Sequence, residues 1–269
     1  MKKILLIIPL IFATSAFSKL NIIVSIQPEV EFVQKIGGDK IDVSLMVEAG
    51  ASPHTYEPKP SQMRDISRAS LYLAIGVEFE KSWLDRFKNQ NINLKIIDIS
   101  KNIEKIDNNP HIWTSPTNIK VIALNIFKAL SSSDSNHTKY YRENLEKFLK
   151  EVNQTDTQIE EILKDIPKNS IFMDFHPAWG YFAKEYGLKE LSIEVNGREP
   201  KPRELIEIIK KAKKERVKAI FTQPEFSDKS AQIIANTLHI KVIKISPLAK
   251  NWNENLINLA KAIANRELK

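Results

Sequence analysis

Three of the five histidines lie in short turns that also contain proline. They are His54 in ASPHTYEP, His111 in NNPHIWTSP and His176 in MDFHPAWGYF, 57 and 65 residues apart along the chain. Histidine is the commonest metal ligand in proteins. In open α/β sheets, ligands bind in the crevice beyond the carboxyl ends of the strands, and turns at those ends can bring distant side chains together. The pattern therefore predicts a metal site made of three imidazoles.

The other two histidines are interpreted differently. His137 opens a polar helical segment, and His239 lies between a helical segment and the strand-like run IKVIKI. Both are expected to be solvated or capping residues, which is the ordinary role of a single histidine. Three histidines at strand ends and helix starts are poorly explained in that way, so the predicted ligands are His54, His111 and His176.

The ligand type restricts the metal. Imidazole suits zinc, copper, iron and nickel, whereas magnesium and calcium prefer all-oxygen sites. Three neutral nitrogens leave the charge of the cation largely uncompensated unless a carboxylate joins them. The candidates are Glu57, three residues after His54, and Glu225 in TQPEF. Glu57 is also a candidate to orient an imidazole N–H, and Glu225 is also explained as an acid at a helix N-terminus.

Three histidines with an open fourth position are also the pattern of a catalytic zinc centre. A secreted three-histidine zinc hydrolase is therefore an alternative function. The chain has no HExxH sequence, and Glu57 is the only plausible general base close to a histidine motif. A binding protein is expected rather than an enzyme.

Short β-branched runs alternate with amphipathic helical segments along most of the chain. Strands are expected at 21–26, 39–47, 71–76, 93–100, 170–175, 188–195, 218–223 and 241–246. Helices are expected at 28–38, 60–69, 80–89, 178–187, 202–215, 228–238 and 252–265, and Ser115-Pro116 predicts another helix start. This alternation is typical of a parallel sheet with crossover helices. The predicted fold is α/β, with two similar lobes of about four strands each and flanking helices.

The middle of the chain predicts one long helix that joins the lobes. Residues 137–166 contain no glycine or proline, and their apolar residues recur at spacings of three, four or seven. Such a helix spans roughly 45 Å. A coiled-coil dimer is the rival interpretation, but the polar stretch 153–158 interrupts its seam. The predicted domains are an N-terminal lobe at 19–135, a linking helix at 136–166 and a C-terminal lobe at 167–269.

The first 18 residues predict a secretory signal peptide. Two lysines precede a ten-residue apolar run from Ile4 to Ala13, and Ala16-Phe17-Ser18 is a small-x-small cleavage pattern. The run is shorter than the roughly 20 residues that a transmembrane helix needs. The chain has no cysteine, so no disulfide, thiolate ligand or lipid-anchoring cysteine is available. A periplasmic protein without a lipid anchor is expected.

The charge balance is moderately basic. The chain has a formal net charge of +7, and removal of the signal peptide leaves 38 basic against 33 acidic side chains, a formal net charge of +5. The surplus is spread over helical segments that also carry glutamates, such as KYYRENLEKFLK. These segments are interpreted as solvated helix faces, and no nucleic-acid partner is expected for an exported protein.

The histidine motifs resemble those of a known family. GASPHTYEPKPSQ, PHIWTSP and FHPAWGYFAKEYGL, followed by IFTQPEF and ISPLAKNW, resemble the metal-receptor solute-binding proteins of zinc and manganese ABC transporters. The resemblance extends from about Asn21 to the C-terminus. It implies two α/β lobes joined by a single long helix with the metal buried between them. It also implies that His54 and His111 are ligands from the first lobe and His176 a ligand from the second.

The family pattern also bears on the choice of metal. Its last ligand is usually an aspartate followed by Pro-Leu-Gly or Ser-Leu-Gly, but this chain has Ser246 there, which leaves water, Glu225 or no donor in the fourth position. Manganese and ferrous receptors of the family typically carry a carboxylate where His176 stands. The resemblance therefore implies Zn²⁺ as the transported ligand, with a manganese or iron receptor as the alternative.

The expected function is a high-affinity zinc receptor that captures Zn²⁺ between its lobes. The resemblance implies delivery to the permease of a metal ABC transporter in the inner membrane, by a monomer that is not itself membrane-embedded. A metal-binding adhesin is a further alternative because some relatives have been described in that way. The lack of a cysteine for lipid attachment argues against an adhesin.

Overall fold

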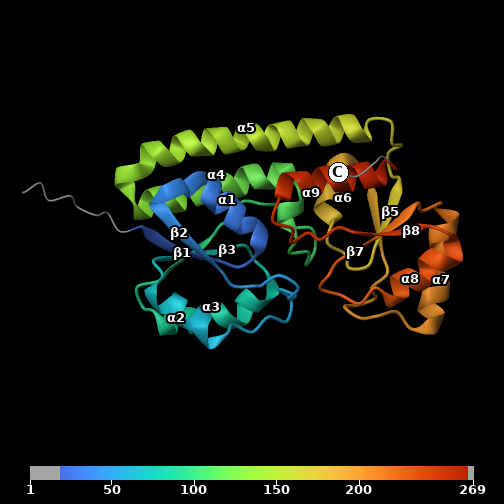
Figure 1. The fold of residues 1–269 in the computed structure, drawn as a ribbon, viewed down its shortest axis with the longest axis horizontal. Coiled ribbons are helices and arrows are strands. Elements are labelled where there is room, and N and C mark those ends of the chain that lie inside the picture. The colour runs from blue at the N-terminus through green and yellow to red at the C-terminus, as the bar shows by residue number, and fades with distance from the viewer. Residues whose placement is uncertain (1–18, 266–269) are drawn as a thin grey trace, which may run out of the picture.

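The computed structural model describes residues 19–265, so the signal peptide predicted for residues 1–18 lies outside the described part of the chain. The described residues form two parallel four-stranded sheets, with the strand orders β2-β1-β3-β4 and β6-β5-β7-β8. The two orders are equivalent, and helices flank each sheet (Figure 1). The predicted α/β class with two similar parallel sheets is confirmed.

The first half of the chain builds the first sheet. Its strands are β1 (Leu20–Val24), β2 (Ile41–Leu45), β3 (Leu71–Ala74) and β4 (Lys95–Asp98). Its helices are α1 (Gln27–Gly37), α2 (Pro60–Arg68), α3 (Glu78–Gln90) and α4 (Pro116–Ser133), with short 3₁₀ turns at Gly38–Lys40, Ile112–Thr114 and Ser135–His137. All four residues of β3 are buried, as expected for a central strand that is covered on both faces.

The second half repeats this plan. Its strands are β5 (Ile171–Asp174), β6 (Lys189–Ser192), β7 (Ala219–Thr222) and β8 (Lys241–Lys244). Its helices are α6 (Gly180–Tyr186), α7 (Pro202–Lys214), α8 (Lys229–Leu238) and α9 (Trp252–Ile263). Among the residues from 19 to 265, no helix combines the length and the apolar character that crossing a membrane requires.

The predicted helix ends have the expected chemistry. The Ser115 hydroxyl accepts a hydrogen bond of 3.2 Å from the backbone N–H of Asn118 and caps α4, which then begins with Pro116. Gly187 ends α6 in the left-handed conformation at φ 69°. His239 ends α8 and His137 immediately precedes α5, so both lie at helix ends as predicted.

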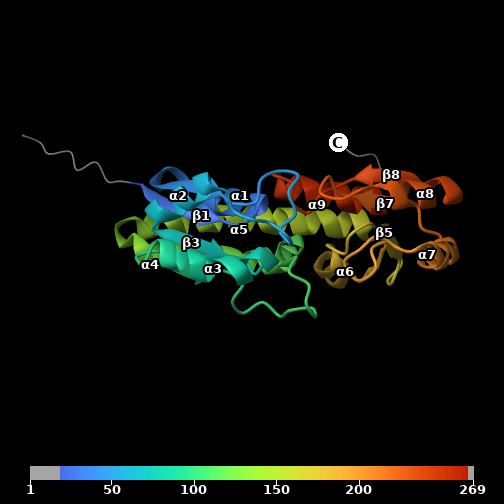
Figure 2. The same cartoon turned by 90° about the horizontal axis from the view of Figure 1, so that it is seen from below.

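The long helix α5 runs from Thr138 to Leu163, which makes it roughly 39 Å long. Figures 1 and 2 show it running alongside both sheets. Its apolar stripe is buried and packs against α1 and α4 from the first half and α9 from the second. The stripe that suggested a coiled coil is therefore covered by helices of the same chain.

Helix α9 makes a second connection between the halves, which the sequence does not predict. The ring of Trp252 meets that of Phe32 on α1 edge-on, with 5.8 Å between the ring centroids. The Trp252 indole N–H donates to the carbonyl of Trp113 at 2.6 Å, and the Trp113 indole N–H donates to the carbonyl of Pro247 at 2.9 Å. One hydrophobic core therefore includes residues of both halves.

The bond from Trp252 to Trp113 gives a stability prediction. Trp252→Phe keeps an aromatic ring on Phe32 but leaves the buried carbonyl of Trp113 without this donor. We expect unfolding in urea to show a loss of about 1–3 kcal/mol, the cost of an unsatisfied buried polar group. Trp83→Phe, at a partly exposed position on α3, is the control and should cost about 0.5 kcal/mol or less. Equal losses in both variants would contradict a specific role for this bond.

Candidate metal centre

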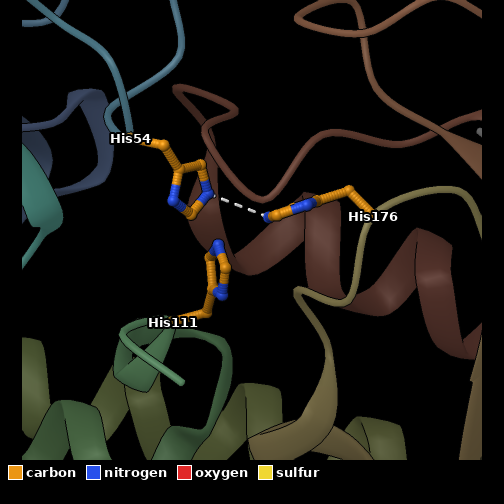
Figure 3. Close-up of side chains that lie close together, drawn as sticks. All are labelled: His54, His111 and His176. Carbon is orange, nitrogen blue, oxygen red and sulfur yellow. Dashed lines mark hydrogen bonds between the residues drawn. The ribbon is translucent and has the colours of Figure 1, made fainter. Parts of the chain in front are cut away.

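The three predicted histidines come together where the two halves meet. His54 lies in the segment between β2 and α2, His111 immediately precedes the 3₁₀ turn before α4, and His176 follows β5 by two residues. The ring centroids lie 4.7 Å apart for His54 and His176, 5.2 Å for His111 and His176, and 5.7 Å for His54 and His111. Figure 3 shows the three rings converging from separate segments of the chain.

One ring nitrogen of each histidine points into this convergence. These three nitrogens lie within 4.8 Å of one another, and the Nε2 atoms of His54 and His176 are 2.9 Å apart. Ligand atoms around a tetrahedral zinc ion lie roughly 3.3 Å apart, given Zn–N distances of about 2.0–2.1 Å. Two imidazole lone pairs this close repel each other unless a proton or a cation lies between them. The arrangement therefore suits a small cation.

The opposite ring nitrogen, Nδ1, has an oxygen partner in all three histidines. An acceptor at Nδ1 holds the proton there, directs the Nε2 lone pair at the metal and fixes the orientation of the ring. Asn109 and Glu194 form hydrogen bonds of 2.8 Å with His111 and His176, and Glu78 lies 3.0 Å from Nδ1 of His54 as an ion-pair contact.

Burial affects the charge states at this site. His111 and His176 are buried, and His54 is partly exposed. Burial, together with the neighbouring rings of His176 and His54, holds the pKa of His111 well below its ordinary value. Burial alone would raise the pKa of Glu78, but contact with His54 holds that pKa below its ordinary value. A neutral His111 is ready to bind a metal, and an ionised Glu78 supports the His54 ring.

The three rings line a small cavity at the junction of the two halves. Its volume is about 20 Å³, compared with roughly 10–15 Å³ for a single water molecule on the same scale. The cavity therefore has the size for one ion or one water. Besides the histidines, it is lined by Ser52, Pro53, Val77, Glu78, Pro110, Trp113, Gln223, Glu225, Phe226, Pro247 and Leu248.

Comparison with known proteins identifies the family. The family model described as "Zinc-uptake complex component A periplasmic" (ZnuA) matches residues 22–266. The chain belongs to this family. It is a metal-binding, periplasmic-type substrate-binding protein of ABC transporters, and its relatives are named for manganese ABC transport and for zinc uptake.

Individual ZnuA-family members resemble the chain over most of its length. A solved structure named "Crystal structure of ZnuA" is 39% identical, with a TM-score of 0.89 over 93% of this chain and 99% of that one. The high-affinity zinc uptake protein ZnuA of Bacillus subtilis is 26% identical over 88% of this chain and 81% of its own. The manganese transporter lipoprotein PsaA of Streptococcus mitis is 25% identical over 83% and 78%. Relatives named for zinc and relatives named for manganese are thus both similar to this chain over most of its length.

The two carboxylates that the sequence indicates as additional ligands, Glu57 and Glu225, differ in their position relative to the cavity. Glu57 is exposed, and the Nδ1 atoms of the three histidines meet Glu78, Asn109 and Glu194 instead, so the interpretation that Glu57 orients an imidazole is wrong. Glu225 does line the cavity. Both of its carboxylate oxygens accept from the hydroxyl of Ser246, at 3.2 and 3.4 Å.

Sequence reasoning missed the acceptors behind the rings. Glu78 and Glu194 follow the ends of β3 and β6, and Asn109 lies two residues before His111. The rule that pointed to the histidines, polar residues beyond the carboxyl ends of parallel strands, could also have indicated the two glutamates. Phe226 was missed as well, and its ring stacks on that of His176 with 4.6 Å between centroids.

Proposed function

We propose that this protein is a zinc receptor that binds one Zn²⁺ through His54, His111 and His176. The observation that supports this most directly is the convergence of three imidazole nitrogens within 4.8 Å, each ring having a side-chain oxygen within 3.0 Å of its far nitrogen. A site of three nitrogens favours zinc over manganese, which prefers oxygen donors. Copper binds such nitrogens more tightly still, so selection against it rests on availability and geometry.

The proposed mechanism is capture followed by delivery to a membrane permease. His54 and His111 belong to the first half and His176 to the second, so a bound ion would connect the two halves. A permease can distinguish loaded from empty receptor only through contacts that differ between those states. Because α5 and α9 both tie the halves together, we propose that loading orders the loops around the site and causes at most a small rotation.

The protein is proposed to act as a monomer in the periplasm, without a lipid anchor. Its proposed lobes are residues 19–135 and 167–269, joined by the helical segment 136–166. The buried face of α5 supports an intramolecular role for that helix. We propose a binding function and no catalytic one, because the cavity accommodates a single ion and Glu57, the base that the sequence offered, lies outside it.

A zinc titration tests the proposed function. Metal-free protein, titrated against a competing chelator, should bind one Zn²⁺ per chain with a dissociation constant on the order of nanomolar or tighter, about −12 kcal/mol. Manganese should bind more weakly under the same conditions. Metal analysis of protein purified without chelators or added metal should also find zinc. Two equally strong sites per chain, no strong site, or tighter binding of manganese would contradict the proposal.

A further inference from the structure

The cavity contains one carboxylate that supports none of the three histidines. Glu225 lies in the segment between β7 and α8, and its side chain is half-buried. Glu78 and Glu194, by contrast, each face the Nδ1 atom of a histidine. Glu225 therefore has the freedom to bind an ion directly, which the two supporting glutamates lack.

The present partner of Glu225 holds it only weakly. The Ser246 hydroxyl can donate a single proton, and its distances of 3.2 and 3.4 Å to the two carboxylate oxygens are at the long end for such bonds. Among residues 19–265, no lysine or arginine forms an ion pair with Glu225. Burial raises the pKa of Glu225, although the bond from Ser246 and the nearby His176 oppose the shift. A cation in the cavity would be a better partner than the hydroxyl.

The neighbouring residue keeps this segment close to the site. Phe226 stacks almost flat on the ring of His176, at an interplanar angle of 22°. Ser246 is held in turn, because its hydroxyl oxygen accepts from the backbone N–H of Leu248 at 3.1 Å. Leu248 and Pro247 line the cavity themselves. The Glu225 carboxylate that now meets Ser246 therefore lies beside the same cavity that the three imidazoles line.

We propose that Glu225 leaves Ser246 when the metal binds and supplies the fourth, oxygen donor to the ion. Zinc in a closed site takes four ligands, and three come from the histidines. The cavity is too small for an ion with several waters, and much of its lining is apolar, including Val77, Trp113 and Leu248. This inference rests on the proposed function and adds a ligand to the same site. A carboxylate ligand also favours harder ions, so Glu225 sets how far the site admits manganese.

The test is a competitive titration of the unmodified protein and three variants with zinc and manganese. Glu225→Gln keeps the size of the side chain and removes its charge, and it should weaken zinc binding at least tenfold and manganese binding more. The double variant Glu225→Gln with Ser246→Asp should recover most of the lost affinity, because residue 246 adjoins the Glu225 carboxylate. Glu57→Gln is the matched control, because it makes the same change at an exposed position three residues after His54. Its affinities for zinc and manganese should equal those of the unmodified protein.

The outcomes separate this inference from the proposed function. If the unmodified protein binds zinc tightly and Glu225→Gln binds it within threefold, a water is the fourth ligand and the role of Glu225 is refuted while the receptor function stands. If Glu225→Gln loses tenfold in zinc affinity and the added Ser246→Asp change does not restore it, Glu225 acts by maintaining the structure of its loop. That result also refutes the ligand role. If the unmodified protein binds no zinc, the proposed function fails and this inference with it.

Discussion

Replacement of any one of the three histidines by alanine should weaken zinc binding by more than about a hundredfold. Loss of a residue that only supports a ligand typically costs about 10–100-fold in metal affinity, so loss of the ligand itself should exceed that range. A hundredfold change corresponds to about 2.7 kcal/mol. The measurement is competitive titration of His54→Ala, His111→Ala and His176→Ala, with circular dichroism of the metal-free proteins to confirm that they fold.

The two remaining histidines provide matched controls. His137 and His239 lie at helix ends, away from the residues that line the cavity. His137→Ala and His239→Ala should therefore bind zinc within about twofold of the unmodified protein. A loss of less than tenfold in all three site variants would refute the three-histidine site. A large loss in only one of them would mean that the other two rings do not contact the ion.

Much of the fold follows from local sequence patterns. The strands form at runs of apolar residues because a parallel strand that is covered on both faces buries successive side chains, as Ile22, Ile23 and Val24 of β1 illustrate. The long helix follows from a segment without glycine or proline and with one apolar face. Residues at helix ends, such as Ser115 and Gly187, act through bonds to their immediate neighbours, so the sequence reveals them directly.

The packing of α9 on the first half could not be predicted in this way. The sequence shows that the helix is amphipathic, but it does not show which surface covers Trp252. The contacts of Trp252 with Phe32 and Trp113 join residues more than 130 positions apart. Such contacts depend on the placement of both sheets and of α5. The connection of the two halves through α9 is therefore a property of the tertiary structure alone.

Only the part of the site that depends on local sequence could be predicted. His54, His111 and His176 share a local context, so their types and turns indicated them together. Glu57 is close to His54 in sequence, yet the carboxylate that faces the His54 ring is that of Glu78 at the start of α3. Glu194 supports His176 because β6 pairs with β5, a neighbour relation fixed by the strand order of the sheet. The position of such glutamates after a strand can be read from the sequence, but the histidine that each one supports becomes evident only when the strand order is known.

Acidification should release the metal. Zinc and protons compete for the same imidazole lone pairs, so zinc affinity falls as the pH is lowered through the pKa of a ligand. An imidazole of ordinary pKa, about 6.5, costs roughly thirtyfold in affinity at pH 5. Because a small part of that cost is already present at pH 7, we expect a loss of at least about 25-fold between pH 7 and pH 5. Equilibrium dialysis against buffered zinc, followed by metal analysis, measures this without a chelator whose own affinity changes with pH.

The number of protons released on zinc binding tests the same site independently. Burial and the neighbouring rings hold the pKa of His111 well below its ordinary value, so His111 should be neutral before the metal arrives. His111 should release no proton when zinc binds near neutral pH. Calorimetry near pH 6 in buffers of different ionisation enthalpy should therefore give fewer than three protons released per zinc ion. Circular dichroism of the metal-free protein over the same range checks that the fold persists. Constant affinity from pH 5 to 7, with no proton release, would mean that carboxylates rather than these imidazoles hold the ion.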